Sequence, residues 1–98
     1  MALNIVWTKR ANNKFDTIIL YLEQEWGMKA TSVFVKKVYN FLDVLIEFPE
    51  IGTLEHKEKN IRGYTITKQV NIYYKIKENK IIIRDFYDNR RHTKRKRY

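Results

Sequence analysis

The stretch "IRGYTITKQVNIYYKIKENKIIIRDFY" (residues 61–87) decides the fold. It contains three runs rich in β-branched and aromatic residues, at 61–67, 70–77 and 80–87, and this composition is typical of strands. Only two residues separate each run from the next. Connections this short join antiparallel strands in hairpins. The sequence therefore predicts a three-stranded antiparallel meander.

The middle run, residues 70–77, indicates what each face of this sheet would carry. In a strand, successive side chains point to opposite faces. Here the alternation separates an apolar set from a polar set, namely Val70, Ile72, Tyr74 and Ile76 against Asn71, Tyr73, Lys75 and Lys77. We therefore expect helices to cover one face, and the other face to stay open and present tyrosines and cations.

The third run contains three successive isoleucines, which is typical of a strand with a neighbour on each edge. Arg84 and Asp85 interrupt its apolar pattern, and strict alternation would place them on opposite faces. We expect Arg84 to lie on the open face beside Tyr73 and Lys75. The alternative is an ion pair between Arg84 and an acid of the helices.

The N-terminal half predicts the helices that cover the sheet. Residues 3–7 read as a short strand, and Thr8 stands where a helix N-cap belongs. Apolar residues then recur at helical spacing over 9–25 and again over 29–47, with Gly27 between the two patterns. Two amphipathic helices with so short a connection form an antiparallel hairpin.

The predicted fold is α+β, in the order β-α-α-β-β-β, as one domain over residues 1–98. The helical hairpin packs on one face of a small, mainly antiparallel, twisted sheet, and the N-terminal strand completes the sheet beside the last strand. Pro49 ends the second helix, and the polar residues 50–60 that follow are expected to form a surface loop.

The net charge of +9 is unevenly distributed. The tail, residues 90–98, holds six cations and no acid, so the rest of the chain is only mildly basic. Such a tail suits an anionic partner, which could be RNA, DNA or an acidic protein segment. A solvated arm that only aids solubility is the alternative interpretation of its last residues.

Composition also excludes several classes of protein. There is no cysteine, so disulfides and thiolate metal sites are excluded. No uninterrupted run of about 18 apolar residues occurs, so a membrane span is not expected. The N-terminus lacks the apolar run of a secretory signal. We expect a cytoplasmic protein that needs no metal and no cofactor.

Five segments in this order resemble the RelE/ParE superfamily, the toxins of bacterial type II toxin–antitoxin modules. The resemblance covers essentially the whole chain, and the segments are "IVWTKRA" (5–11), "LIEFPEIG" (45–52), "IRGY" (61–64), "YYKI" (73–76) and "IIIRDFYDNRR" (81–91). The resemblance implies a cytoplasmic toxin that stops growth. It also implies a tight hetero-oligomer with a cognate antitoxin, which is expected to be acidic and DNA-binding.

The resemblance implies one of two mechanisms, metal-free cleavage of messenger RNA on the ribosome or inhibition of DNA gyrase. Metal-free cleavage needs a base, an acid and cations around the phosphate. If the chain is such a nuclease, Arg91 matches the late arginine, and Tyr87 or Tyr98 the late tyrosine. Relatives in this fold use a late histidine as acid–base group, so His92 is the titratable candidate. A surface histidine in a basic arm is the alternative.

The rest of the nuclease set matches less well. Arg62 and Gly63 fit the superfamily's "RG" step, but Asn71 occupies the position of the middle-strand arginine. Thr65 and Thr67 occupy the positions of the strand lysines. Residues that we expect to contact nucleic acid or a protein target are Arg62, Lys68, Tyr73, Lys75, Arg84 and Arg90.

Three hypotheses follow from this comparison. Inhibition of gyrase is favoured because it needs no nuclease set. The first alternative is a ribonuclease with a rearranged set, Arg62, Lys68, Tyr87, Arg91 and His92. The second is a non-toxic remnant that only binds an antitoxin. In each case we expect the antitoxin to use the exposed helix stripe or the sheet edges, by an amphipathic helix or an added strand.

Overall fold

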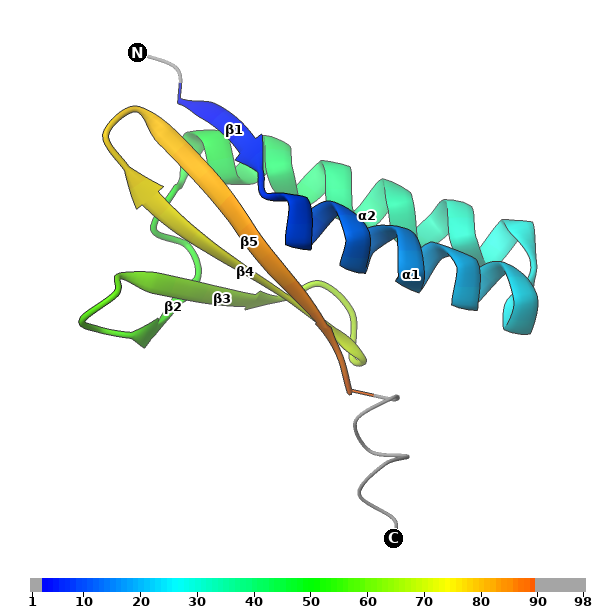
Figure 1. The fold of residues 1–98 in the computed structure, drawn as a ribbon. Coiled ribbons are helices and arrows are strands. Elements are labelled where there is room, and N and C mark those ends of the chain that lie inside the picture. Colours follow the sequence, from blue (N-terminus) through cyan, green and yellow to red (C-terminus); the bar gives the residue numbers. More distant parts are fainter. Residues whose placement is uncertain (1–2, 90–98) are drawn as a thin grey trace, which may run out of the picture.

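The computed structural model describes residues 3–89. Two helices and five strands follow one another along this part of the chain. They are β1 (Asn4–Trp7), α1 (Lys9–Trp26), α2 (Met28–Glu47), β2 (Thr53–His56), β3 (Ile61–Thr65), β4 (Val70–Lys77) and β5 (Lys80–Asp88). Both helices lie on the same side of the sheet and leave its other face uncovered (Figure 1). The predicted fold class is confirmed.

The five strands form one sheet in the order β1-β5-β4-β3-β2. The pairs β2·β3, β3·β4 and β4·β5 are antiparallel, so the predicted meander is present. The N-terminal strand β1 runs parallel to β5, with Asn4 opposite Lys80 and Trp7 opposite Ile83. The predictions that β1 pairs with the last strand and that β5 has a neighbour on each edge are therefore confirmed.

The strand β2 lies inside the segment that the sequence predicts to be a loop. It pairs with β3, with Thr53 opposite Gly63 and Leu54 opposite Arg62. All four of its residues are exposed. The loop prediction is wrong here because an edge strand with no buried face has no alternation of apolar and polar residues to reveal it.

The helical hairpin begins and turns where the sequence predicts. The Thr8 hydroxyl accepts a hydrogen bond from the Ala11 amide at 3.0 Å and caps α1. Gly27 has φ of +90°, a conformation that favours glycine, and its amide donates to the Leu22 and Glu23 carbonyls at the end of α1. Neither helix is both long and apolar enough to span a bilayer.

The core lies between the hairpin and the sheet. Val70, Ile72 and Tyr74 of β4 are buried, as the alternation predicts. Aromatic rings join the layers, since Trp7 lies 5.2 Å from Phe15 and 5.5 Å from Phe86 between ring centroids. The remaining buried hydrophobic side chains are Ala11, Phe15, Ile18, Leu22, Phe34, Val38, Phe41, Leu42, Leu45, Ile81, Ile83 and Phe86.

A β-bulge interrupts the pairing of β4 with β5. Tyr73 is opposite Asp85 and Tyr74 is opposite Ile83, so Arg84 is the extra residue. Ile83 and Phe86 are both buried, whereas Arg84 is exposed and Asp85 half-buried between them. Because the bulge resets the alternation, Asp85 shares the uncovered face with Tyr73. The expectation that Arg84 and Asp85 lie on opposite faces is wrong for this reason.

Candidate functional site

The uncovered face of the sheet contains a groove over β2, β3 and β4. Its volume is about 390 Å³. Polar side chains dominate its lining, which consists of Ile51, Thr53, Glu55, Gly63, Tyr64, Thr65, Asn71 and Tyr73. The groove is therefore a shallow polar surface and not an enclosed apolar pocket.

Gly63 and Tyr73 form the floor of the groove. They are directly opposite each other on β3 and β4. A Cβ atom on Gly63 would lie 2.8 Å from Cε1 of Tyr73 and 3.0 Å from Cγ of Glu55, so only glycine lets the tyrosine ring cross the neighbouring strand. Beside it, the Asn71 amide group donates to the Tyr73 hydroxyl at 3.4 Å. The sequence motif "IRGY" thus shapes this surface through its glycine.

Glu55 is the one charged side chain among the described residues that line the groove. Thr65 and Asn71, which the resemblance to the superfamily matches to cation positions of its ribonucleases, both line it. An anionic phosphate placed here would meet a carboxylate and neutral dipoles. The groove is therefore less cationic than the alternation of β4 indicates for the open face as a whole.

Two predicted binding residues, Tyr73 and Lys75, and Tyr87, predicted to be catalytic if the chain is a nuclease, lie together on the open face. Tyr73 lines the groove, and Tyr87 lies beside it because Tyr87 is opposite Asn71. Lys75 is on the same face, two residues from Tyr73 and opposite Ile82, and is half-buried. Their roles in binding stay predictions.

Arg62 and Lys68 lie away from this groove. Arg62 is opposite Tyr74 and so faces the helices. Its guanidinium donates to the Gly52 carbonyl at 2.8 Å and the Glu50 carbonyl at 3.3 Å. Lys68 is exposed in the turn between β3 and β4. Arg90, Arg91 and His92 lie outside the described residues. Among the described members of the proposed nuclease set, Arg62 therefore lies on the covered side of the sheet, away from Tyr87.

The sequence does not predict the role of the Tyr74 hydroxyl. This hydroxyl is buried, donates to the Pro49 carbonyl at 2.7 Å and accepts from the Gly52 amide at 2.9 Å. Burial raises the pKa of Tyr74, and the Gly52 hydrogen bond opposes this rise. The phenol and the Arg62 guanidinium together fix the turn from α2 to β2. The apolar alternation in β4 predicts a buried Tyr74 but gives no sign of its hydroxyl's partners.

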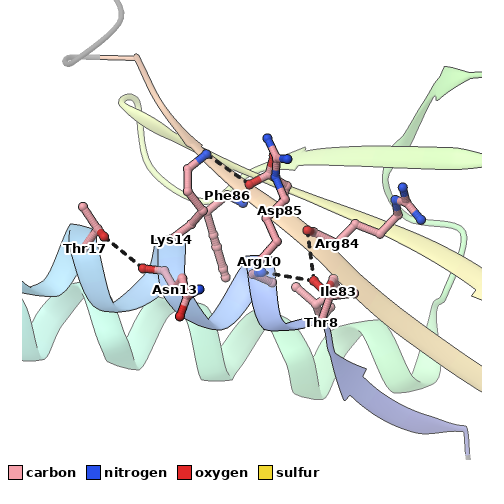
Figure 2. Close-up of polar contacts among 10 residues, drawn as sticks. Thr8, Arg10, Asn13, Lys14, Thr17, Ile83, Arg84, Asp85 and Phe86 are labelled. Carbon is pink, nitrogen blue, oxygen red and sulfur yellow. Dashed lines mark hydrogen bonds and ion pairs between the residues drawn. The ribbon is translucent and has the colours of Figure 1, made fainter.

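Asp85 links β5 to α1 at the bulge. Its carboxylate accepts from Nε of Arg10 at 3.1 Å and from Nζ of Lys14 at 3.2 Å, as Figure 2 shows. The backbone amide of Phe86 also donates to it, at 2.9 Å. The Arg84 side chain points away from α1 (Figure 2). Among residues 3–89, the structure forms no ion pair with the Arg84 guanidinium, so the alternative of a pair with an acid of the helices is not observed.

Residues 5–92 match the family described as the ParE toxin of type II toxin–antitoxin systems, parDE. The chain belongs to the ParE toxin family. No curated protein sequence matches this ParE-family toxin. Because the family consists of toxins from two-protein modules, a cognate antitoxin is implied as its partner.

Solved structures share the fold of this ParE-family toxin. One is the chromosomal ParDE system from P. aeruginosa, with a TM-score of 0.73, 15% identity, and coverage of 88% of this chain and 95% of that chain. The YoeB/ParE toxin from Agrobacterium tumefaciens has a TM-score of 0.66 and 12% identity, with coverage of 88% of this chain and 98% of that chain. The YoeB dimer from Staphylococcus aureus has a TM-score of 0.62 and 20% identity, with coverage of 87% of this chain and 94% of that chain.

The toxin also presents apolar hollows on α2, which adjoin the groove on the open face and share Ile51, Tyr64 and Thr65 with its lining. The first lies between α2 and the end of β3 and is lined by Lys37, Asn40, Phe41, Val44, Tyr64, Thr65 and Ile66. The second lies at the turn after α2 and is lined by Glu47, Phe48, Pro49, Glu50 and Ile51. Val44, Phe48 and Ile51 are large apolar side chains that remain exposed there.

Proposed function

We propose that this ParE-family toxin acts in the cytoplasm and arrests growth by binding a protein target, with DNA gyrase as the target that resemblance suggests. The observation that carries the proposal is the charge of the open-face groove, where Glu55 is the one charged residue of the described lining. Protein binding makes no demand for cations at this place.

Metal-free RNA cleavage would require cations at the open-face groove. Its transition state places extra negative charge on the phosphate, and each preorganised donor to such a charge is worth about 3 kcal/mol of barrier. Asn71 and Thr65 carry no charge, and the Glu55 carboxylate would repel the phosphate. Arg62 donates to backbone carbonyls on the covered side. These positions support the gyrase hypothesis over the ribonuclease hypothesis.

The test is to induce the chain alone and follow two readouts in the same cells. A reporter of DNA damage should rise, and primer extension should find translated messages intact. Purified gyrase should lose supercoiling activity when the purified toxin is added. Codon-linked cuts in messages, with gyrase unaffected, would contradict the proposal and favour the ribonuclease with Arg91, His92 and Tyr87. Normal growth on induction would instead indicate a non-toxic remnant.

For the antitoxin, the exposed apolar surface of α2 suggests the mode of binding. An amphipathic segment that lies along α2 would place apolar residues on Val44 and Phe48. Lys37 at the edge of the first hollow offers a partner for an acid of that segment. We therefore infer that an amphipathic and acidic segment of the antitoxin covers these hollows.

A further inference from the structure

Arg84 adjoins an acid in the sequence and yet does not pair with it. Asp85 is the next residue, but its two carboxylate oxygens are taken by other cations, Oδ2 by Arg10 and Oδ1 by Lys14. Among residues 3–89, neither of the two ion pairs formed includes Arg84. A guanidinium that could have been neutralised by its neighbour is thereby left exposed on the open side of the sheet.

Several hydrogen bonds fix this arrangement at the bulge. The Thr8 hydroxyl donates to the carbonyls of Ile83 and Arg84, each at 3.1 Å. The Phe86 amide donates to Asp85 Oδ1 at 2.9 Å, which orients the carboxylate. Both the backbone and the carboxylate are therefore held, and Figure 2 shows the Lys14 side chain reaching from α1 to Asp85 while Arg84 extends in another direction. Bulges commonly re-aim a side chain in this way.

We propose that Arg84 is a specificity-determining residue that binds one carboxylate of the toxin's protein target. Arg10 and Lys14 are positioning residues, because they occupy Asp85 and prevent it from capturing Arg84. This inference rests on the proposed function, namely growth arrest by binding a protein. The apolar hollows inferred to bind the antitoxin are lined by residues of α2, β3 and the connections that follow them, so Arg84 on β5 lies outside them.

The chemistry of the surrounding face favours a carboxylate over a nucleic acid. A phosphate backbone binds through several cations that act together. Here the described open face carries Lys75 beside Arg84, and Lys77 and Lys80 at the far end of the β4·β5 pair, whereas Asp85 and Glu55 are acids on the same face. A single carboxylate needs only one guanidinium, whose planar fork can hold both oxygens.

The first experiment compares folded variants for growth arrest after induction without antitoxin, at protein levels matched by immunoblot. Arg84→Gln and Arg84→Glu should raise the inducer concentration needed for half-maximal arrest by about tenfold or more, because a charge-assisted hydrogen bond is lost. Arg84→Lys keeps the positive charge but lacks the planar guanidinium. The inducer concentration that it needs for half-maximal arrest should therefore lie between those of the wild type and of Arg84→Gln. The control is Lys80→Glu, the same charge change at an exposed residue of the same strand.

The second experiment tests the positioning residues by rescue. Arg10→Gln with Lys14→Gln frees Asp85 to pair with Arg84, so toxicity should fall by about the same factor as in Arg84→Gln. Adding Asp85→Asn to this double variant should restore wild-type arrest, because asparagine can still accept the Phe86 amide but does not bind a guanidinium as an ion pair. A merely structural role of Arg10 and Lys14 would give no such rescue. Thermal unfolding of each purified variant identifies any that fails to fold.

The outcomes separate the inference from the function on which it rests. Folded Arg84 variants that arrest growth like the wild type would overturn the role of Arg84. A double variant that is fully toxic, or that Asp85→Asn does not restore, would overturn the positioning role. A wild type that fails to arrest growth, or that cuts messages, would instead contradict the proposed function.

Discussion

At the scale of single residues, buried hydroxyl and glycine positions decide the local geometry. Gly63 lets the Tyr73 ring cross β3, and the Tyr74 hydroxyl joins the Pro49 carbonyl to the Gly52 amide. The alternation of β4 predicts correctly which of these tyrosines is buried. It does not predict their partners, because those come from the connection between α2 and β2, whose path the sequence pattern leaves open.

Tyr74→Phe should lower the free energy of unfolding by about 1–3 kcal/mol, because it leaves the buried Gly52 amide without its acceptor. Because burial raises the pKa of Tyr74, the native phenol keeps its proton at a pH where the unfolded phenol, with its usual pKa of about 10, has lost it. The resulting stabilisation is complete below pH about 10 and is lost as pH rises beyond it.

Urea unfolding of both proteins between neutral and alkaline pH measures this effect. The difference in stability between wild type and Tyr74→Phe should narrow above pH about 10. Lysines titrate in the same range, but they are common to both proteins and cancel in the difference. A difference that stayed constant to high pH would show that the native phenol titrates like the unfolded one.

At the scale of elements, Thr8 joins three parts of the fold. Its hydroxyl accepts from Ala11 to cap α1 and donates to Ile83 at the end of the β1·β5 pairing. Thr8→Ala should therefore cost about 1–2 kcal/mol of unfolding free energy. Thr17 is a matched control, since its hydroxyl donates only to Asn13 within the exposed part of α1. Thr17→Ala should change stability by about 0.5 kcal/mol or less.

Chemical unfolding of the two variants measures this contrast, and equal losses for Thr8 and Thr17 would show that the junction adds nothing beyond one hydroxyl. The Asp85 ion pairs should contribute little to stability in comparison, because the side chains of Arg10 and Lys14 are 72% and 41% exposed. We expect these ion pairs to act instead by keeping Asp85 from pairing with Arg84.

The elements that the sequence predicts are those with a buried face. The helices and the meander have one, so apolar spacing identifies them. β2 has none, and its existence depends on backbone pairing with β3. The sequence does not predict the bulge at Arg84, because an alternating pattern assumes that each residue of one strand lies opposite one residue of the next. The candidate groove was predicted only through Asn71, Tyr73 and Thr65, and Glu55 was missed because it lies on β2.

At the scale of the whole molecule, this ParE-family toxin presents two adjoining surfaces, a polar groove on the sheet and apolar hollows on α2. Val44→Asp should weaken neutralisation by co-expressed antitoxin by about tenfold or more without reducing toxicity, because it places a charge against apolar contacts. Val6 on β1 is 41% exposed against 40% for Val44, so Val6→Asp is a matched control.

The measurement is the antitoxin level that restores growth to cells expressing each variant. Equal antitoxin requirements for Val44→Asp, Val6→Asp and the wild type would place the antitoxin elsewhere. A loss of toxicity in Val44→Asp, with the fold intact, would mean that α2 contacts the target and that the two surfaces are not separate.

The parallel pairing of β1 with β5 has a consequence for how the toxin is made. Asn4 pairs with Lys80, so β1, the first strand, must wait for β5, the last of the described strands, to leave the ribosome. A nascent chain therefore holds its helical hairpin against an incomplete sheet until β5 has left the ribosome. Messages truncated before codon 80 yield fragments without the strand that β1 and β4 both need. Synthesis itself thus delays the appearance of a harmful product.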